Sequence, residues 1–168
     1  MPVYGNGNSK GAYLMKTGMG SKIIGIVLFF LVILMALFIG GGQHAIAIFT
    51  DIPSLLFVTL IPLSMSLLAG LTSDYLRSFK IVFGGSAYSI NECKASSIAM
   101  SLMIKLVYLS GFIGSLIGFV QLLRYLDNPL NIGPALSVVV LTLFYALIFN
   151  VLQHSMKAKI DKEIASKE

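Results

Sequence analysis

Charged residues are scarce in this 168-residue chain: Asp, Glu, Lys and Arg make up 11% of it, against about 25% in an ordinary soluble domain. Hydrophobic residues make up 57% of the chain, and its mean hydropathy is +0.89. A fold exposed to water needs more polar surface than this, so the composition excludes an ordinary soluble enzyme. Tryptophan is absent, and a single cysteine, Cys93, excludes a disulfide within the chain.

Basic residues outnumber acidic ones by 12 to 7, and the formal net charge is +5. So few basic residues in so apolar a chain are typical of the edges of a membrane rather than of a nucleic-acid surface. We therefore expect contact with membrane lipid and none with nucleic acid.

Four long apolar runs predict four transmembrane helices, over about residues 23–42, 53–70, 104–123 and 133–152. Each is close to the roughly 20 residues that a bilayer requires. Asp51 followed by Pro53 is typical of a helix start. The fold class predicted is therefore an all-α integral membrane protein, with a single membrane domain over residues 22–156.

The third and fourth helices are expected to extend beyond the membrane. Ser89-Ile-Asn-Glu92 has the form of a capping box, which predicts that the third helix begins near Ile90. The polar tail 157–168 consists largely of good helix formers and is expected to continue the fourth helix. Residues 1–21 are rich in Gly and Asn without a clear period, and we expect a flexible N-terminal segment there.

The distribution of basic residues orients the predicted bundle. If both termini are cytoplasmic, 11 of the 12 basic residues lie on the cytoplasmic side, and Arg124 is the one that lies outside. Cytoplasmic loops carry the excess of Lys and Arg in multi-pass membrane proteins. The sequence therefore predicts that both termini and the extended helix ends are cytoplasmic.

Catalytic and metal-binding patterns are missing from the sequence. No Asp, Glu, Lys, Arg or His lies in the middle of a predicted span, whereas proton relays and ion carriers usually need an ionisable group there. His44 and His154 lie far apart in the sequence and have no second ligand at metal-binding spacing. We therefore expect no enzyme, no bound metal and no ion transport by this chain alone.

The third and fourth spans carry the most informative residues. Gly111, Gly114 and Gly118 recur every three or four positions, which favours a close helix–helix approach. Ser115 lies 9 residues before Arg124 and Thr142 lies 9 residues after Gly133. An antiparallel pair therefore puts both hydroxyls about 13.5 Å below the outer edge. They either face a common lumen or bond a carbonyl one turn back in their own helix.

Several short motifs in this order resemble the MotA/TolQ/ExbB family, and in particular its flagellar stator A subunits. The third and fourth spans contain Gly111-Phe-Ile-Gly-Ser-Leu-Ile-Gly118, Asp127-Asn-Pro-Leu-Asn-Ile-Gly-Pro-Ala135 and Leu141-Thr-Leu-Phe144, followed by Asn150. Upstream, Phe49-Thr-Asp-Ile-Pro-Ser-Leu-Leu56 is similar to the start of the second helix in the four-span members.

The resemblance implies a bacterial inner-membrane protein in which five copies surround a dimer of a single-span B subunit. A transmembrane Asp of that partner would carry a proton or a sodium ion, with no other cofactor. Ser115 and Thr142 would line the ion path, and the outer mouth would be shaped by Asp51, Pro53, Asp127 and Pro129. Flagellar members have a large cytoplasmic insert where this chain has a short segment, so the process powered is motility or another function of the cell envelope.

Two other classes of protein remain open. A small four-span transporter would carry an ionisable residue within a span, and a purely structural membrane scaffold would need no partner carboxylate. A neighbouring gene that encodes one span containing Asp, followed by a periplasmic domain, would favour the ion-driven complex.

The predicted orientation can be tested by cysteine labelling in a background with Cys93→Ser. Lys94→Cys should resist a membrane-impermeant maleimide added from outside, because residue 94 is expected on the cytoplasmic side. Arg124→Cys should react, because residue 124 is expected on the outer side. Labelling of Lys94→Cys but not of Arg124→Cys would reverse the orientation.

Overall fold

The computed structural model describes residues 19–84, 88–124, 126–127 and 129–168. Within these residues every regular element is a helix. The longest two are α5 (Ile90–Arg124) and α6 (Pro129–Ala165). The rest are α1 (Met19–Gly41), the 3-10 turn η1 (Gly42–His44), α2 (Ala45–Ile48), α3 (Ile52–Leu68) and α4 (Thr72–Gly84). Of the predicted flexible segment 1–21, residues 1–18 lie outside the described residues and the last three belong to α1.

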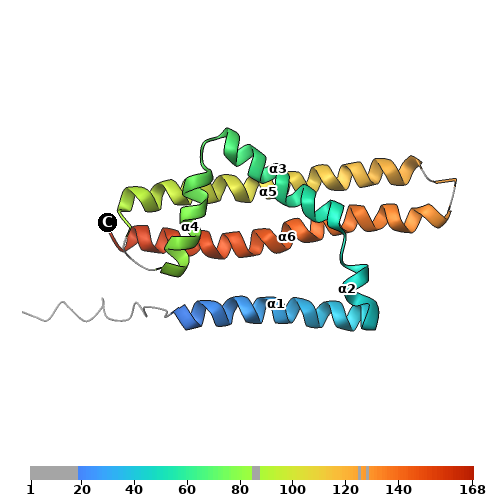
Figure 1. Ribbon diagram of the computed structural model, residues 1–168, viewed down its shortest axis with the longest axis horizontal. Coiled ribbons are helices and arrows are strands. Elements are labelled where there is room, and N and C mark those ends of the chain that lie inside the picture. Colours follow the sequence, from blue (N-terminus) through green and yellow to red (C-terminus); the bar gives the residue numbers. More distant parts are fainter. Residues whose placement is uncertain (1–18, 85–87, 125, 128) are drawn as a thin grey trace, which may run out of the picture.

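An antiparallel hairpin of α5 and α6 forms the long axis of the molecule (Figure 1). The helices have 35 and 37 residues, about 52 and 55 Å at the 1.5 Å rise per residue, which exceeds the roughly 30 Å of a hydrocarbon core. α5 begins at Ile90, as the capping box predicts: the Ser89 N–H donates to Glu92 Oε2 at 2.8 Å, and the Glu92 N–H donates to Ser89 Oγ at 3.3 Å. α6 continues through the predicted tail to Ala165.

The seam between the two helices is marked by buried residues that recur three or four positions apart. On α5 these residues are Cys93, Ser96, Met100, Met103, Val107, Gly111, Gly114 and Gly118. On α6 the buried positions at matching spacing are Ala135, Thr142, Ala146, Asn150, Gln153 and Ile160. This spacing matches the turn of an α-helix and so keeps one face of each helix against the other along the hairpin.

The three glycines of α5 lie on this seam and face α6. A Cβ atom built on Gly111 would lie 2.4 Å from Ala146 Cβ, and one on Gly118 would lie 2.9 Å from the Val139 nitrogen. At Gly114 the nearest atom would be Thr142 Cγ2, at 2.9 Å. The small residues therefore serve a close approach within the chain.

Helices α3 and α4 pack across the hairpin. Val58 of α3 is buried with Val107 of α5 and Ala146 of α6. A second cluster joins α4 to the half of the hairpin that contains the start of α5 and the end of α6, and consists of Ile81, Val82, Cys93, Met100, Ile104 and Ile160. The chain turns between α3 and α4 at Gly70, whose φ of 68° is a conformation that glycine adopts without strain.

The second predicted span, 53–70, corresponds to α3, which has only 17 residues. α1, α5 and α6 are long and apolar enough to cross a membrane, and α3 and α4 together would supply a fourth crossing only as one span bent by 115°. The amphipathic helix α4 was not predicted, since the sequence analysis expected only a short cytoplasmic segment between the second and third spans. The described residues are thus those of a helical, multi-pass membrane protein, with helices long and apolar enough for three crossings, or for four if the bent pair is one span.

Helix α1 has no buried residue and lies beside the hairpin (Figure 1). Near its start, Lys22 Nζ donates to the Val82 carbonyl at the end of α4, at 2.5 Å. At its other end, η1 and α2 lead the chain back to the middle of α6. Its apolar side chains require lipid or another protein around them.

The glycine seam predicts a stability test with a built-in rescue. Gly111→Ala should destabilise the hairpin by about 1–3 kcal/mol, because the new methyl group overlaps that of Ala146. Adding Ala146→Gly should recover most of this loss. Unfolding in detergent, followed by circular dichroism, measures both changes.

Gly133→Ala is the control, because a Cβ atom there meets nothing within 4 Å. It should leave the unfolding free energy unchanged or raise it slightly through better helix propensity. Equal effects of Ala at 111 and 133 would contradict close packing at the seam.

Candidate functional site

The junction between α2 and α3 is tied to the middle of α6 by one phenol group. The Tyr145 hydroxyl donates to the Phe49 carbonyl at 2.5 Å and accepts from the Asp51 N–H at 2.9 Å. The ring of Phe49 also contacts that of Phe144, with centroids 5.8 Å apart. Phe144 and Tyr145 of α6 therefore hold Phe49 and Asp51, at the two ends of the short link between α2 and α3.

The carboxylate of Asp51 is held locally. Asp51 occupies the N-cap position of α3, but its side chain accepts a hydrogen bond from the buried Ser54 hydroxyl and caps no backbone N–H. Its carbonyl accepts the first helical hydrogen bond, from the Leu55 N–H at 3.1 Å. The predicted helix start is therefore present, with the side-chain hydrogen bond made to a hydroxyl instead of the backbone.

The four residues expected at the outer mouth do not lie together. Asp127 lies in the turn between α5 and α6, and Pro129 is the first residue of α6. Asp51 lies beside Tyr145, which follows Pro129 by 16 residues, about 24 Å along the helix axis. Pro53 lies in the first turn of α3, two residues after Asp51, and so belongs with Asp51 and not with Asp127. Asp51 and Asp127 thus belong to separate places in the fold.

Asp51 brings an ionisable group to the level of the apolar part of α6. Tyr145 lies between Pro129 and Lys157, the first charged residue of α6, which follows it by 12 residues, about 18 Å. The sequence shows no charge within a predicted span, because Asp51 precedes the apolar run of α3. After α1, the chain turns back through η1 and α2 towards the middle of α6, and this places Asp51 beside Tyr145.

Ser115 and Thr142 lie at one level of the hairpin, because Gly114 packs directly on Thr142. The Thr142 hydroxyl donates to the Val138 carbonyl at 2.7 Å, and its oxygen lies 3.2 Å from the Val139 carbonyl. This is the back-bonded arrangement that the sequence left open. Thr142 is 1% exposed and Ser115 is 9% exposed. Within a single chain, both side chains are therefore buried and line no open channel.

Two buried amides of α6 were missed as candidates for function. Asn150 donates through Nδ2 to the Ala146 carbonyl at 2.9 Å, while its Oδ1 has no partner among the described residues. The same holds for Oε1 of Gln153, a residue that is 5% exposed. A polar side chain within an apolar run was the signal available in the sequence, since unpaired polar atoms are costly in an apolar environment.

Over the residues that the structure describes, no group of three or more His, Cys, Asp or Glu side chains is placed to hold a metal ion. A hydrogen-bonded network with one carboxylate is present instead, and it joins Tyr145, Asp51 and Ser54. It lies about one turn of α6 from Thr142. The negative charge of such a carboxylate can attract a cation.

Comparisons with known proteins gave no match to a protein-family model, to a curated protein or to a solved structure.

The clamp on the α2–α3 junction predicts the effect of removing one hydroxyl. Tyr145→Phe leaves the Phe49 carbonyl and the Asp51 N–H without their partner, so the protein should lose about 1–3 kcal/mol of stability. Hydrogen exchange at the Asp51 amide should also accelerate. Detergent unfolding and mass-spectrometric exchange measure the two effects.

Tyr108→Phe is the matched control, because Tyr108 is exposed and its ring contacts His154. It should change neither quantity appreciably. Unchanged exchange at Asp51 in Tyr145→Phe would show that the phenol does not hold the junction.

Proposed function

We propose that this protein is the ring-forming A subunit of an ion-driven complex of the MotA/TolQ/ExbB type in the bacterial inner membrane. Five copies would surround a dimer of a single-span B subunit, whose transmembrane Asp carries a proton or a sodium ion. Each ion step would turn the ring relative to the dimer and drive motility or another process of the envelope. Both termini would lie in the cytoplasm.

The observation that supports this proposal most is the α5–α6 hairpin. It carries the motifs that resemble the family, it exceeds the thickness of a bilayer, and it has Ser115 and Thr142 at one level. Its outward side chains are large and apolar, and on α5 they include Phe112, Ile113, Leu116, Ile117, Phe119 and Val120. Such a surface suits lipid, neighbouring copies and a partner helix.

The hydroxyls can assist an ion because of how they are bonded. Thr142 donates its proton to a carbonyl, which leaves lone pairs of the hydroxyl oxygen available as acceptors. Ser115 lies on α5 next to the Gly114–Thr142 contact and is the more accessible of the two. In the ring they would offer oxygen atoms to a proton or cation beside the partner's Asp, whose charge is costly in a low-dielectric surrounding.

A second candidate function is a small transporter that moves an ion through this chain alone. The position of Asp51 favours it, because the carboxylate lies at the level of the apolar part of α6. Ionisable groups at such depth in membrane proteins usually mark an ion or substrate pathway. The two candidates differ in whether the isolated chain conducts.

The ion path predicts graded losses of flux. Ser115→Ala and Thr142→Val should each reduce ion flux of the complex with its B subunit severalfold, because each removes one hydroxyl oxygen. Valine keeps the methyl group of Thr142 that packs on Gly114, so assembly should persist. Flux into liposomes, normalised to the amount of complex, measures the effect.

Ser137→Ala is the control, because Ser137 is exposed on α6 and about 140° around the helix from Thr142. It should conduct like the wild type. Wild-type flux in both Ser115→Ala and Thr142→Val would remove the hydroxyls from the ion path.

The assembly itself can be counted by native mass spectrometry after purification with the B subunit from the adjacent gene. We expect five copies with two, and no flux from this chain alone. Flux from the isolated chain that Asp51→Asn abolishes would instead establish the transporter. A monomer or dimer with and without the B subunit would refute the ring.

A further inference from the structure

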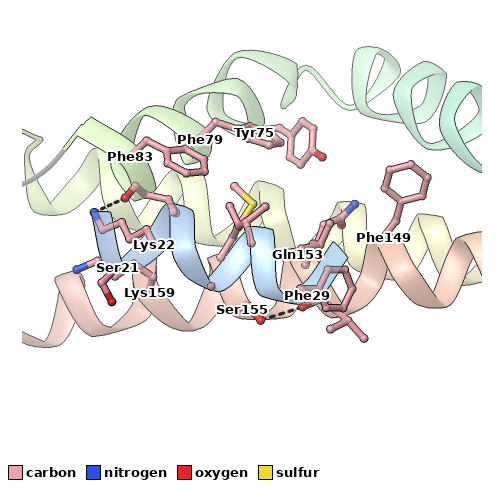
Figure 2. Close-up of a pocket in the computed structure, with 16 residues that line it drawn as sticks. Ser21, Lys22, Phe29, Tyr75, Phe79, Phe83, Phe149, Gln153, Ser155 and Lys159 are labelled. Carbon is pink, nitrogen blue, oxygen red and sulfur yellow. Dashed lines mark hydrogen bonds between the residues drawn. The ribbon is translucent and has the colours of Figure 1, made fainter. Parts of the chain in front are cut away.

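A cleft of about 640 Å³ lies between α1, α4 and α6 (Figure 2). Its volume falls within the roughly 300–1,000 Å³ of small-molecule sites. The apolar side chains that line most of it include Ile26, Phe29, Phe79, Phe83, Leu152 and Met156. The interior of the cleft therefore suits a hydrocarbon chain.

The wall that α1 contributes is not packed against the others. α1 has no buried residue, and a Cβ atom at Gly25, which lines the cleft, would meet nothing within 4 Å. Leucine at this position would therefore project into free space. The cleft has room beside α1 for an occupant of its own.

Two lysines mark one end of the cleft (Figure 2). Lys22 of α1 donates to the Val82 carbonyl at 2.5 Å, and Lys159 of α6 pairs with Glu163 at 2.6 Å. Two ammonium groups face one carboxylate there, so this end has an excess of positive charge. It is also the end of α6 that continues into the polar tail 157–168.

A buried amide lies deeper in the same cleft. Gln153 lines it, is 5% exposed, and has no partner for Oε1 among the described residues. It precedes Lys159 by six residues, about 9 Å towards the middle of the membrane. Its carbonyl oxygen is an acceptor and its surroundings are otherwise apolar, so the charge of the site comes from the two lysines alone.

We propose that the cleft binds one phospholipid with an anionic headgroup from the leaflet on the lysine side. The acyl chain lies along Phe29 and Met156, and the phosphate takes a place between Lys22 and Lys159. Anionic lipid fits better than neutral lipid because its net charge is opposite to that of the two ammonium groups. This site depends neither on a ring nor on ion flux.

The test compares lipids bound to the full chain in mild detergent. Native mass spectrometry with phosphatidylglycerol and phosphatidylcholine at equal concentration should show a preference for phosphatidylglycerol of about tenfold. Lys22→Gln with Lys159→Gln should abolish the preference. Lys80→Gln with Lys94→Gln, which removes the same charge outside the cleft, should retain it.

Blocking the cleft supplies a second measurement. Gly25→Leu should lower the retention of both lipids severalfold. Gly40→Leu is its control, because it adds the same side chain to an equally open position of α1 outside the cleft. Equal retention of the two lipids by the wild type would overturn the proposal. So would retention that Gly25→Leu leaves unchanged, the result expected if α1 closes the cleft or a second copy fills it.

Discussion

The close contact of α5 with α6 is the constraint on which the other positions depend. Gly111, Gly114 and Gly118 allow the two backbones to approach until Cβ atoms would overlap. In a membrane, helices gain little by hiding apolar surface from lipid, so close van der Waals contact over a long seam is a main source of their association. The resulting hairpin is the surface against which α3 and α4 pack, through Val58 and through the cluster around Ile81. It also fixes Ser115 and Thr142 at one level.

The parts of the fold that local sequence determines were predicted well. Long apolar runs located the longest helices, and the Ser89–Glu92 box located the start of α5, because its two hydrogen bonds join residues three apart. The amphipathic α4 was missed although Tyr75, Phe79 and Phe83 recur every four residues along it, because the helix has only 13 residues. The depth of Asp51 was missed for a different reason. The Tyr145 hydroxyl bonds residues 94 and 96 positions away, and no pattern in a single sequence encodes that pairing.

In the candidate site, too, the features set by local spacing were predicted, and those set by contacts between distant residues were not. The spacing of Ser115 and Thr142 from the ends of their spans correctly put them at one level, because antiparallel helices of known rise fix relative depth. Spacing gives no rotation about the axis, so it did not decide between a lumen and a back-bonded hydroxyl. Asp51 changes the chemistry available to the chain. A carboxylate bonded to Ser54 beside Tyr145 is a titratable group at the level of apolar α6, where the sequence indicated none.

The absence of buried residues in α1 has a mechanical consequence. α3 and α4 share buried side chains with the hairpin, so a force that tilts α5 and α6 must move them too. α1 is joined to the rest near its two ends, by Lys22 on Val82 and by the junction on Tyr145. Between these points it can slide or tilt in the bilayer without opening any buried contact of its own. α1 is therefore connected to the rest of the molecule near its two ends and shares no buried side chain with the hairpin between them.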